Sequence, residues 1–122
     1  MFPHAFLVIF SSFSRGCYAK MNILSLKKNM PATKTTTDYK IIDFAGITGQ
    51  VLKWRKEGRS LVFSNGCFDL LHAGHVRYLQ TAATFADIFI LGLNSDSSVR
   101  KLKGSQRPIM SQDDRALLLS AL

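Results

Sequence analysis

The spacing of apolar residues divides the chain from residue 41 onward into helical and extended segments. Residues 41–57 carry apolar side chains at intervals of four and three, which predicts a helix that ends before Gly58. Residues 75–86 show a similar spacing and predict a second amphipathic helix. Residues 60–64 and 88–93 are short apolar runs, and the second is continuously apolar, as expected of a strand covered on both faces. The repeating apolar positions of the two helices are Ile47, Val51 and Trp54, then Val76, Leu79, Ala83 and Ala86.

The order of these segments predicts the fold class. The helix, strand, helix and strand are followed by a polar, basic loop at residues 94–108 and by a last helix at residues 115–122. Ser111 and Asp114 form a capping-box pattern in front of that last helix. The strand–helix–strand segment is a βαβ unit, whose crossover is nearly always right-handed. We therefore expect an α/β fold with a doubly wound parallel sheet.

The number of predicted strands bears on how complete this domain is. Two parallel strands with open edges bury too little apolar surface to be stable alone. We therefore expect residues 41–122 to be the N-terminal part of a larger domain, truncated after the first βαβ unit and the helix that follows it.

Residues 1–40 differ from the rest of the chain and are expected to be a poorly structured extension. Residues 31–40 are polar and show no periodicity. Residues 6–10 are apolar, but they lack the preceding Lys or Arg that a secretory signal would require. The run is also too short to span a membrane. Translation from Met30 is the favoured alternative, in which case residues 1–29 would not be part of the protein.

Charge and cysteine content restrict the partners and the compartment. The net charge is +8, with ten basic and three acidic residues up to residue 60 and six basic against five acidic residues after it. Because the excess lies in the N-terminal half and the C-terminal half is almost neutral, a nucleic-acid-binding module is supported by charge alone and we expect no nucleic-acid partner. Cys17 and Cys67 cannot form a disulfide framework, which favours a reduced, cytoplasmic protein without membrane attachment.

The segment NGCFDLLHAGH, residues 65–75, carries the candidate chemistry. It lies beyond the carboxyl end of the first predicted strand, where open α/β sheets bind ligands, and it leads into a helix whose free N–H groups attract anions. Gly66 and Gly74 would let the backbone approach a phosphate, and His72 and His75, three residues apart, could donate hydrogen bonds to it. This chemistry suits phosphoryl-type transfer, which depends on positioning and charge stabilisation.

Other interpretations of this segment remain open. The two histidines could simply cap the helix or pack against it. Cys67, His72 and His75 could bind zinc, but the neighbouring sequence offers no further ligand, so we predict no metal site. The segment matches neither the dinucleotide fingerprint G-x-G-x-x-G nor a Walker A loop.

The same segment resembles the G-x-F-D-x-x-H-x-G-H signature of the cytidylyltransferase-like nucleotidyltransferase superfamily. The resemblance continues through HVRYLQTA, LGLNSDSSVRKLKGSQRPI and DRALLLSAL, and covers about residues 61–122. This longer run is most similar to the adenylyltransferases that act on D-glycero-β-D-manno-heptose 1-phosphate on the route to ADP-heptose and lipopolysaccharide.

The resemblance implies a Rossmann-like domain that joins a sugar phosphate to the AMP part of ATP, usually with Mg²⁺, while pyrophosphate leaves. It implies that the catalytic residues are His72 and His75. The residues implied for nucleotide binding are Gly66, Cys67, Phe68, Asp69, Gly74 and Lys103. Lys101 is implied to contact the substrate phosphate, although Lys101 and Lys103 could also belong to a solvated basic loop. Arg107 and Arg115 are weaker candidates, and Arg115 could be an exposed helix charge.

The resemblance also leaves alternatives. The family has a second, Ser/Thr-rich phosphate-binding signature that these 122 residues do not include. The chain could therefore be a non-catalytic fragment of such an enzyme, or part of a related cytidylyltransferase that uses CTP and a polyol phosphate. Family members commonly pair, so a homodimer is a further alternative.

Overall fold

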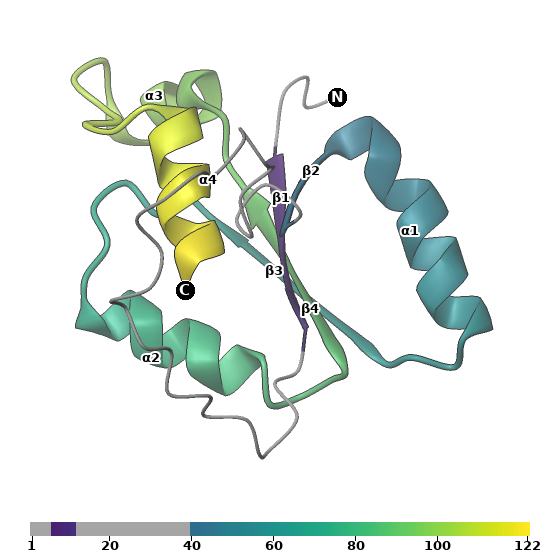
Figure 1. The fold of residues 1–122 in the computed structure, drawn as a ribbon. Coiled ribbons are helices and arrows are strands. Elements are labelled where there is room, and N and C mark those ends of the chain that lie inside the picture. The colour runs from purple at the N-terminus through teal and green to yellow at the C-terminus, as the bar shows by residue number, and fades with distance from the viewer. Residues whose placement is uncertain (1–5, 12–39) are drawn as a thin grey trace, which may run out of the picture.

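The computed structural model of the protein describes residues 6–11 and 40–122. The described part contains four strands and four helices (Figure 1). In chain order they are β1 (Phe6–Ser11), β2 (Ile41–Asp43), α1 (Phe44–Lys56), β3 (Leu61–Gly66), α2 (Ala73–Ala82), β4 (Ile88–Leu93), α3 (Asp96–Lys103) and α4 (Gln112–Ala121).

The strands form one sheet in the order β2-β1-β4-β3. β3 and β4 are parallel and joined through α2, with Leu61 opposite Ile88 and Gly66 opposite Leu93. The α/β fold class and the βαβ unit predicted from the sequence are therefore confirmed. Because β3 and β4 run in the same direction, their carboxyl ends meet at one edge of the sheet, where the glycine turn begins.

The sheet contains two strands that the sequence did not predict. β1 pairs antiparallel with β4 along all six of its residues and with β2 along three. β1 lies inside residues 1–40, which were expected to lack regular structure, and this expectation is wrong for residues 6–11. The helix expected at residues 41–57 begins only at Phe44, because the Asp43 side chain accepts a hydrogen bond from Gly46 N at 2.7 Å and so caps the helix there.

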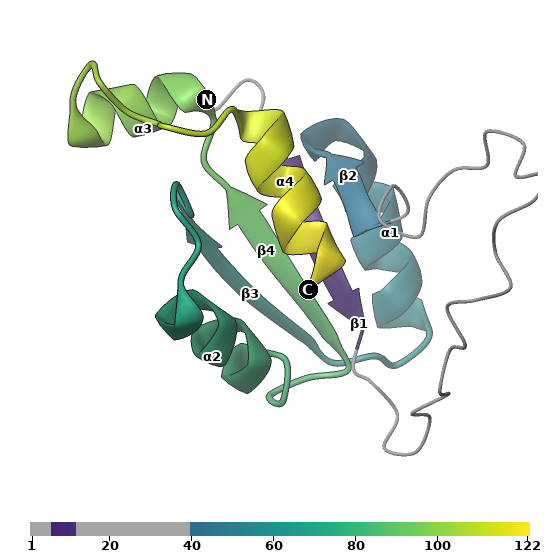
Figure 2. The ribbon, with the colours of Figure 1, turned by 60° about the vertical axis from the view of Figure 1, so that its left-hand side comes forward.

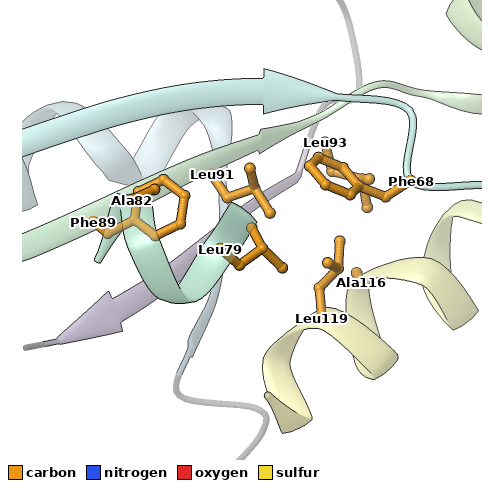
Figure 3. Packing of buried hydrophobic residues seen from close by; sticks show 8 residues of the cluster. All are labelled: Phe68, Leu79, Ala82, Phe89, Leu91, Leu93, Ala116 and Leu119. Atoms are coloured by element: carbon orange, nitrogen blue, oxygen red, sulfur yellow. The ribbon is translucent and has the colours of Figure 1, made fainter. Parts of the chain in front are cut away.

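Helices cover both faces of the sheet, α1 on one side and α2 with α4 on the other (Figure 2). Alternate residues of β4 supply both cores, because successive side chains of a strand point to opposite faces. Ile88 and Ile90 pack with Ile47 of α1. The larger cluster on the opposite face is drawn in Figure 3 and consists of Phe68, Leu79, Ala82, Phe89, Leu91, Leu93, Ala116 and Leu119.

The region predicted as a polar loop contains a helix, so the prediction for residues 94–108 is wrong over α3. Ser95 caps α3 by accepting a hydrogen bond from Ser98 N at 3.2 Å, and Val99 is fully buried beneath it. Gly104, with a φ of 96°, ends it. The capping box predicted before α4 is confirmed, since Asp114 N donates to Ser111 Oγ at 3.2 Å.

Candidate active site

The glycine turn begins where β3 and β4 end side by side. The backbone N–H of Asn94, just past β4, donates to the carbonyl of Gly66 at 3.0 Å. The Asn94 side-chain amide also lies 3.6 Å from the sulfur of Cys67. These two contacts hold the start of the turn against the neighbouring strand, so the turn has a fixed origin at the edge of the sheet.

His72 is the residue that caps α2. Its backbone is extended, and its Nδ1 accepts a hydrogen bond from the backbone N–H of Gly74 at 3.1 Å. A neutral imidazole has one acceptor nitrogen and one donor nitrogen. Because Nδ1 accepts, Nε2 is the nitrogen that carries the proton, and the exposed ring can offer that N–H to a ligand.

His75 stands against His72 and Phe68. The centroids of the two imidazole rings are 3.9 Å apart, and the ring of Phe68 lies 5.1 Å from that of His75. Within the part of the chain that the structure describes, Nδ1 of His75 is buried and has no hydrogen-bond partner. Burial lowers the pKa of His75, and the nearby charges of His72 and Lys103 lower it further. The pKa of His75 therefore lies below its ordinary value, which favours the neutral imidazole.

Two glycines of the turn are required by close contacts. A Cβ on Gly66 would lie 2.6 Å from Cε2 of Phe68, and a Cβ on Gly74 would lie 2.9 Å from Nδ1 of His72. Phe68 itself has a positive φ of 47°, which is uncommon for a residue with a side chain. The absence of side chains at the two glycines thus lets Phe68 and His72 take the positions from which both contact His75.

A hollow of about 260 Å³ opens beside the turn. It is smaller than the roughly 300–1,000 Å³ typical of small-molecule sites. The structure thus brings together five of the residues singled out from the sequence, Gly66, Cys67, Phe68, His75 and Lys103. Asn65 and Tyr78 also line the hollow and were not predicted from the sequence.

The two lysines of α3 differ in their position. Both are exposed, but Lys103 lines the hollow and Lys101 does not. A helix turns by about 100° per residue, so side chains two apart point to nearly opposite sides. A loop gave no reason to expect different positions for Lys101 and Lys103, whereas the helix explains why only one of them lines the hollow.

Asp69 faces away from the hollow and holds the turn. Its buried carboxylate accepts hydrogen bonds from Arg107 at 2.7 Å and from the backbone N–H groups of Ile109 and Met110 at 2.7 and 3.3 Å. Burial alone would raise the pKa of Asp69, but these hydrogen bonds and the charge of Arg107 outweigh it and lower the pKa below its usual value. Both carboxylate oxygens are therefore occupied within the fold, and Asp69 does not line the predicted nucleotide site.

Arg115 was interpreted from the sequence as a possible exposed charge, and that interpretation is wrong. The residue is completely buried. Its guanidinium donates to the carbonyl of Cys67, to the carbonyl of Met110 and to the carboxylate of Asp96. The sequence signal that could have suggested burial is its position beside Ala116 and Leu119 on the inner face of α4.

The described residues limit what else could bind near the turn. Among residues 40–122 no three His, Cys, Asp or Glu side chains lie close enough together to hold a metal ion. The zinc alternative for Cys67, His72 and His75 therefore has no supporting ligand cluster in this region. None of the described helices is long and apolar enough to cross a membrane.

Comparison with known proteins agrees with the geometry of the turn. A family model described as cytidylyltransferase-like matches residues 63–122. The chain is 66% identical to the bifunctional protein HldE of Wolinella succinogenes over 70 residues, which are 57% of this chain and 15% of that protein. It is 52% identical to HldE of Sulfurimonas denitrificans over 89 residues, which are 73% of this chain and 19% of that protein.

A third relative, HldE of Geobacter metallireducens, is 50% identical over 86 residues, which are 70% of this chain and 18% of that protein. The chain thus spans less than a fifth of the length of the relatives it matches. The matched segment includes the whole glycine turn with its two histidines and continues through α2, β4, α3 and α4. Through residues 63–122, the chain belongs to the cytidylyltransferase-like family and is by family a nucleotidyltransferase.

Proposed function

We propose that the chain forms the nucleotide-binding part of an enzyme that transfers AMP from ATP to heptose 1-phosphate and releases pyrophosphate, a step of ADP-heptose biosynthesis. The observation that carries the proposal is the pair of adjacent imidazole rings of His72 and His75 at the N-terminus of α2, of which His75 lines the hollow together with Lys103. The hollow thus combines an imidazole and a positive charge beside a helix N-terminus, which suits a phosphate group. The choice of ATP and heptose rests on the resemblance of residues 61–122 to the heptose 1-phosphate adenylyltransferases.

The reaction requires no activated protein nucleophile. An oxygen of the sugar phosphate attacks the α-phosphorus of ATP, the bond from that phosphorus to the β-phosphate oxygen breaks, and pyrophosphate takes the electron pair. Negative charge accumulates on the α-phosphate oxygens as this happens. The proton on Nε2 of His72 can be donated as a hydrogen bond to that charge, and the Lys103 ammonium attracts it. The removal of one such donor typically lowers the rate about 100- to 1,000-fold.

His75 contributes in a different way because its ring is partly buried and neutral. Neutral imidazole has a hydrogen-bond donor and does not repel the charge of Lys103. It also keeps the ring of His72 in place through their 3.9 Å contact. We therefore assign His72 and His75 to stabilisation of the α-phosphate, and Gly66, Cys67, Phe68 and Gly74 to the shape of the surface on which the nucleotide lies.

Mg²⁺ is assigned to the nucleotide rather than to the protein. Mg²⁺ prefers oxygen ligands and commonly retains several waters while it bridges substrate phosphates. The seven residues that line the hollow include no carboxylate, and Asp69 and Asp96 are already bound to Arg107 and Arg115. The described residues therefore do not fit a Mg²⁺ site of their own, and the ion would enter together with ATP. We place the reaction in the cytoplasm, where ATP is available.

The test is pyrophosphate release by the purified chain with ATP, Mg²⁺ and heptose 1-phosphate. We expect release that His75→Ala lowers about 100-fold or more. Arg77→Ala is the matched control, since Arg77 lies on the same helix, is exposed and does not line the hollow. Equal rates in His75→Ala and the parent chain would refute the assignment of the site. Turnover with CTP and glycerol 3-phosphate instead would support the related cytidylyltransferase.

The second candidate function is a non-catalytic fragment that binds the nucleotide without turning it over. The observation that favours it is the size of the hollow, about 260 Å³, which is below the roughly 300–1,000 Å³ typical of small-molecule sites. Calorimetric titration with ATP separates the two. Binding that is weakened by His72→Ala, without pyrophosphate release, would support the fragment and refute catalysis by this chain.

A further inference from the structure

A single buried guanidinium connects three segments around the candidate site. Nη1 of Arg115 donates to the carbonyl of Cys67 in the glycine turn, and Nε donates to the carbonyl of Met110 at 3.2 Å. Nη2 donates to Oδ1 of Asp96, the first residue of α3, at 2.6 Å. Arg115 is completely buried, whereas the side chain of Asp96 is 31% exposed. The turn, the segment before α4 and the start of α3 are therefore fixed to the same side chain.

The link to Asp96 controls where the other end of α3 lies. A helix rises about 1.5 Å per residue, so the backbone of Lys103 lies about 10 Å from that of Asp96. A rotation of α3 by about 10° around its start would therefore move Lys103 by nearly 2 Å, which is enough to break a hydrogen bond. Val99 is the only residue of α3 that is fully buried, so packing offers one apolar anchor and the ion pair supplies a second, directional one.

We propose that Arg115 is a positioning residue that, through Asp96 and the carbonyl of Cys67, holds Lys103 of α3 opposite His75 of α2. Its importance for catalysis rests on the proposed function. The positioning itself is a property of the fold and exists without a nucleotide.

The chemistry of arginine explains why this position would not accept lysine. The guanidinium is planar and sends donors in several fixed directions, and here Nε, Nη1 and Nη2 each reach a different segment. A lysine has one nitrogen on a flexible stem and cannot join all three. Arg115→Lys keeps the charge but removes the geometry, so it tests positioning separately from electrostatics.

The experiment measures the pKa of His75 by NMR titration of its imidazole signals, without nucleotide. The charged or titratable groups near His75 are His72, Lys103, Cys67 and Tyr78. A nearby positive charge disfavours protonation, so Lys103→Gln should raise the pKa of His75. Lys101→Gln is the matched control, because it removes the same charge from the same helix outside the hollow, and it should raise that pKa much less.

The decisive step repeats Lys103→Gln in an Asp96→Ala background. If the ion pair with Arg115 positions Lys103, the rise in the pKa of His75 should shrink by about half or more, because Lys103 is no longer held near it. The direct effect of removing the Asp96 charge cancels in this double-mutant cycle. Arg115→Lys should shrink the rise in the same way.

The proposal is overturned if Lys103→Gln raises the pKa of His75 equally in both backgrounds, or if Lys101→Gln raises it as much as Lys103→Gln. Should Asp96→Ala not fold, as judged by circular dichroism, Asp96→Asn replaces it, since the amide keeps an acceptor oxygen but loses the charge. Failure of both variants to fold would assign the ion pair to stability and also overturn the positioning role. None of these outcomes depends on whether the chain transfers AMP, so the proposed function is tested separately.

Discussion

Gly74→Ala is the substitution for which the structure predicts the clearest separation of stability from activity. A Cβ at this position would lie 2.9 Å from Cε1 and Nδ1 of the His72 ring, closer than normal packing allows. His72 is exposed and can rotate away to relieve the contact. The rotation would break the hydrogen bond from the backbone N–H of residue 74 to Nδ1 and would end the stacking on His75.

The two effects of Gly74→Ala on the free energy of unfolding nearly cancel. The loss of a helix N-cap costs about 0.5–2 kcal/mol, typically near 1. Replacement of glycine by alanine within a helix gains about 0.8–1 kcal/mol, and somewhat less in the first turn. The free energy of unfolding should therefore change by less than about 1 kcal/mol. If His72 acts on the α-phosphate as proposed, the rate of pyrophosphate release should fall about 100-fold or more, because its donor is displaced.

Urea denaturation followed by circular dichroism gives the first quantity, and a coupled pyrophosphate assay gives the second. Gly49→Ala is the matched control, since Gly49 lies in α1 and a Cβ there would meet nothing within 4 Å. It should stabilise the chain by about 0.5–1 kcal/mol and leave the rate unchanged. If Gly74→Ala keeps the parent rate while His72→Ala slows the reaction, the argument that the glycine places the ring is wrong.

Two further substitutions and one deletion test the contacts that hold the site and the sheet together. Asp69→Asn should lower the free energy of unfolding at pH 7 by about 1.5–3 kcal/mol, because a charge-assisted hydrogen bond to Arg107 is lost. The pKa of Asp69 in the folded protein lies below the ordinary 3.8. The charged carboxylate therefore stabilises the fold above pH 3.8, and this stabilisation is lost as the pH falls through the folded pKa. Urea denaturation at progressively lower pH should show a shrinking difference in the free energy of unfolding between the parent chain and Asp69→Asn. Gly66→Ala should cost about 1–3 kcal/mol in the same assay, because the Phe68 ring 2.6 Å from the new Cβ must move, and an unchanged midpoint would contradict this. Deletion of residues 1–11 removes β1 and opens the edge of β4, so size-exclusion chromatography should show association, whereas a stable monomer would mean that β1 is dispensable.

Local sequence patterns were sufficient for the elements closest to the site. β3 and β4 were predicted because they are short apolar runs, and α2 because apolar residues recur on one face. α2 nevertheless ends at Ala82, before Ala83 and Ala86 of that predicted stripe. The glycine turn was located because its chemistry lies between a strand and a helix. The structure gathers Gly66, Cys67, Phe68, His75 and Lys103 around one hollow, and their roles in nucleotide binding stay predictions.

The elements that were missed depend on contacts between distant parts of the chain. α3 has two apolar residues among eight, Val99 and Leu102, which is too few to show a helical period. β1 pairs with β4 about eighty residues later, and nothing in the local pattern of residues 6–11 identifies that partner. Arg115 contacts Cys67 across 48 residues, and Asp69 contacts Ile109 across 40. Charged side chains are rarely buried unless they are paired, so an exposed helix charge was one of the two interpretations of Arg115 that the sequence allowed.

The buried charges of Asp69 and Arg115 are better explained by the positions that they give to neighbouring residues than by a contribution to stability. The desolvation cost of burying an ion pair often cancels its attraction, and apolar replacements of equal volume are often as stable. Asp69 and Arg115 nevertheless meet at Met110, whose N–H donates to one and whose carbonyl accepts from the other. The residue between Cys67 and Asp69 is Phe68, whose backbone has the unfavourable positive φ. A strained residue of this kind persists only where its surroundings hold it on both sides. The hydrogen bonds of Asp69 and Arg115 therefore hold the backbone on both sides of Phe68. Through the contact of the Phe68 ring with His75, they also fix the position of residues that line the hollow.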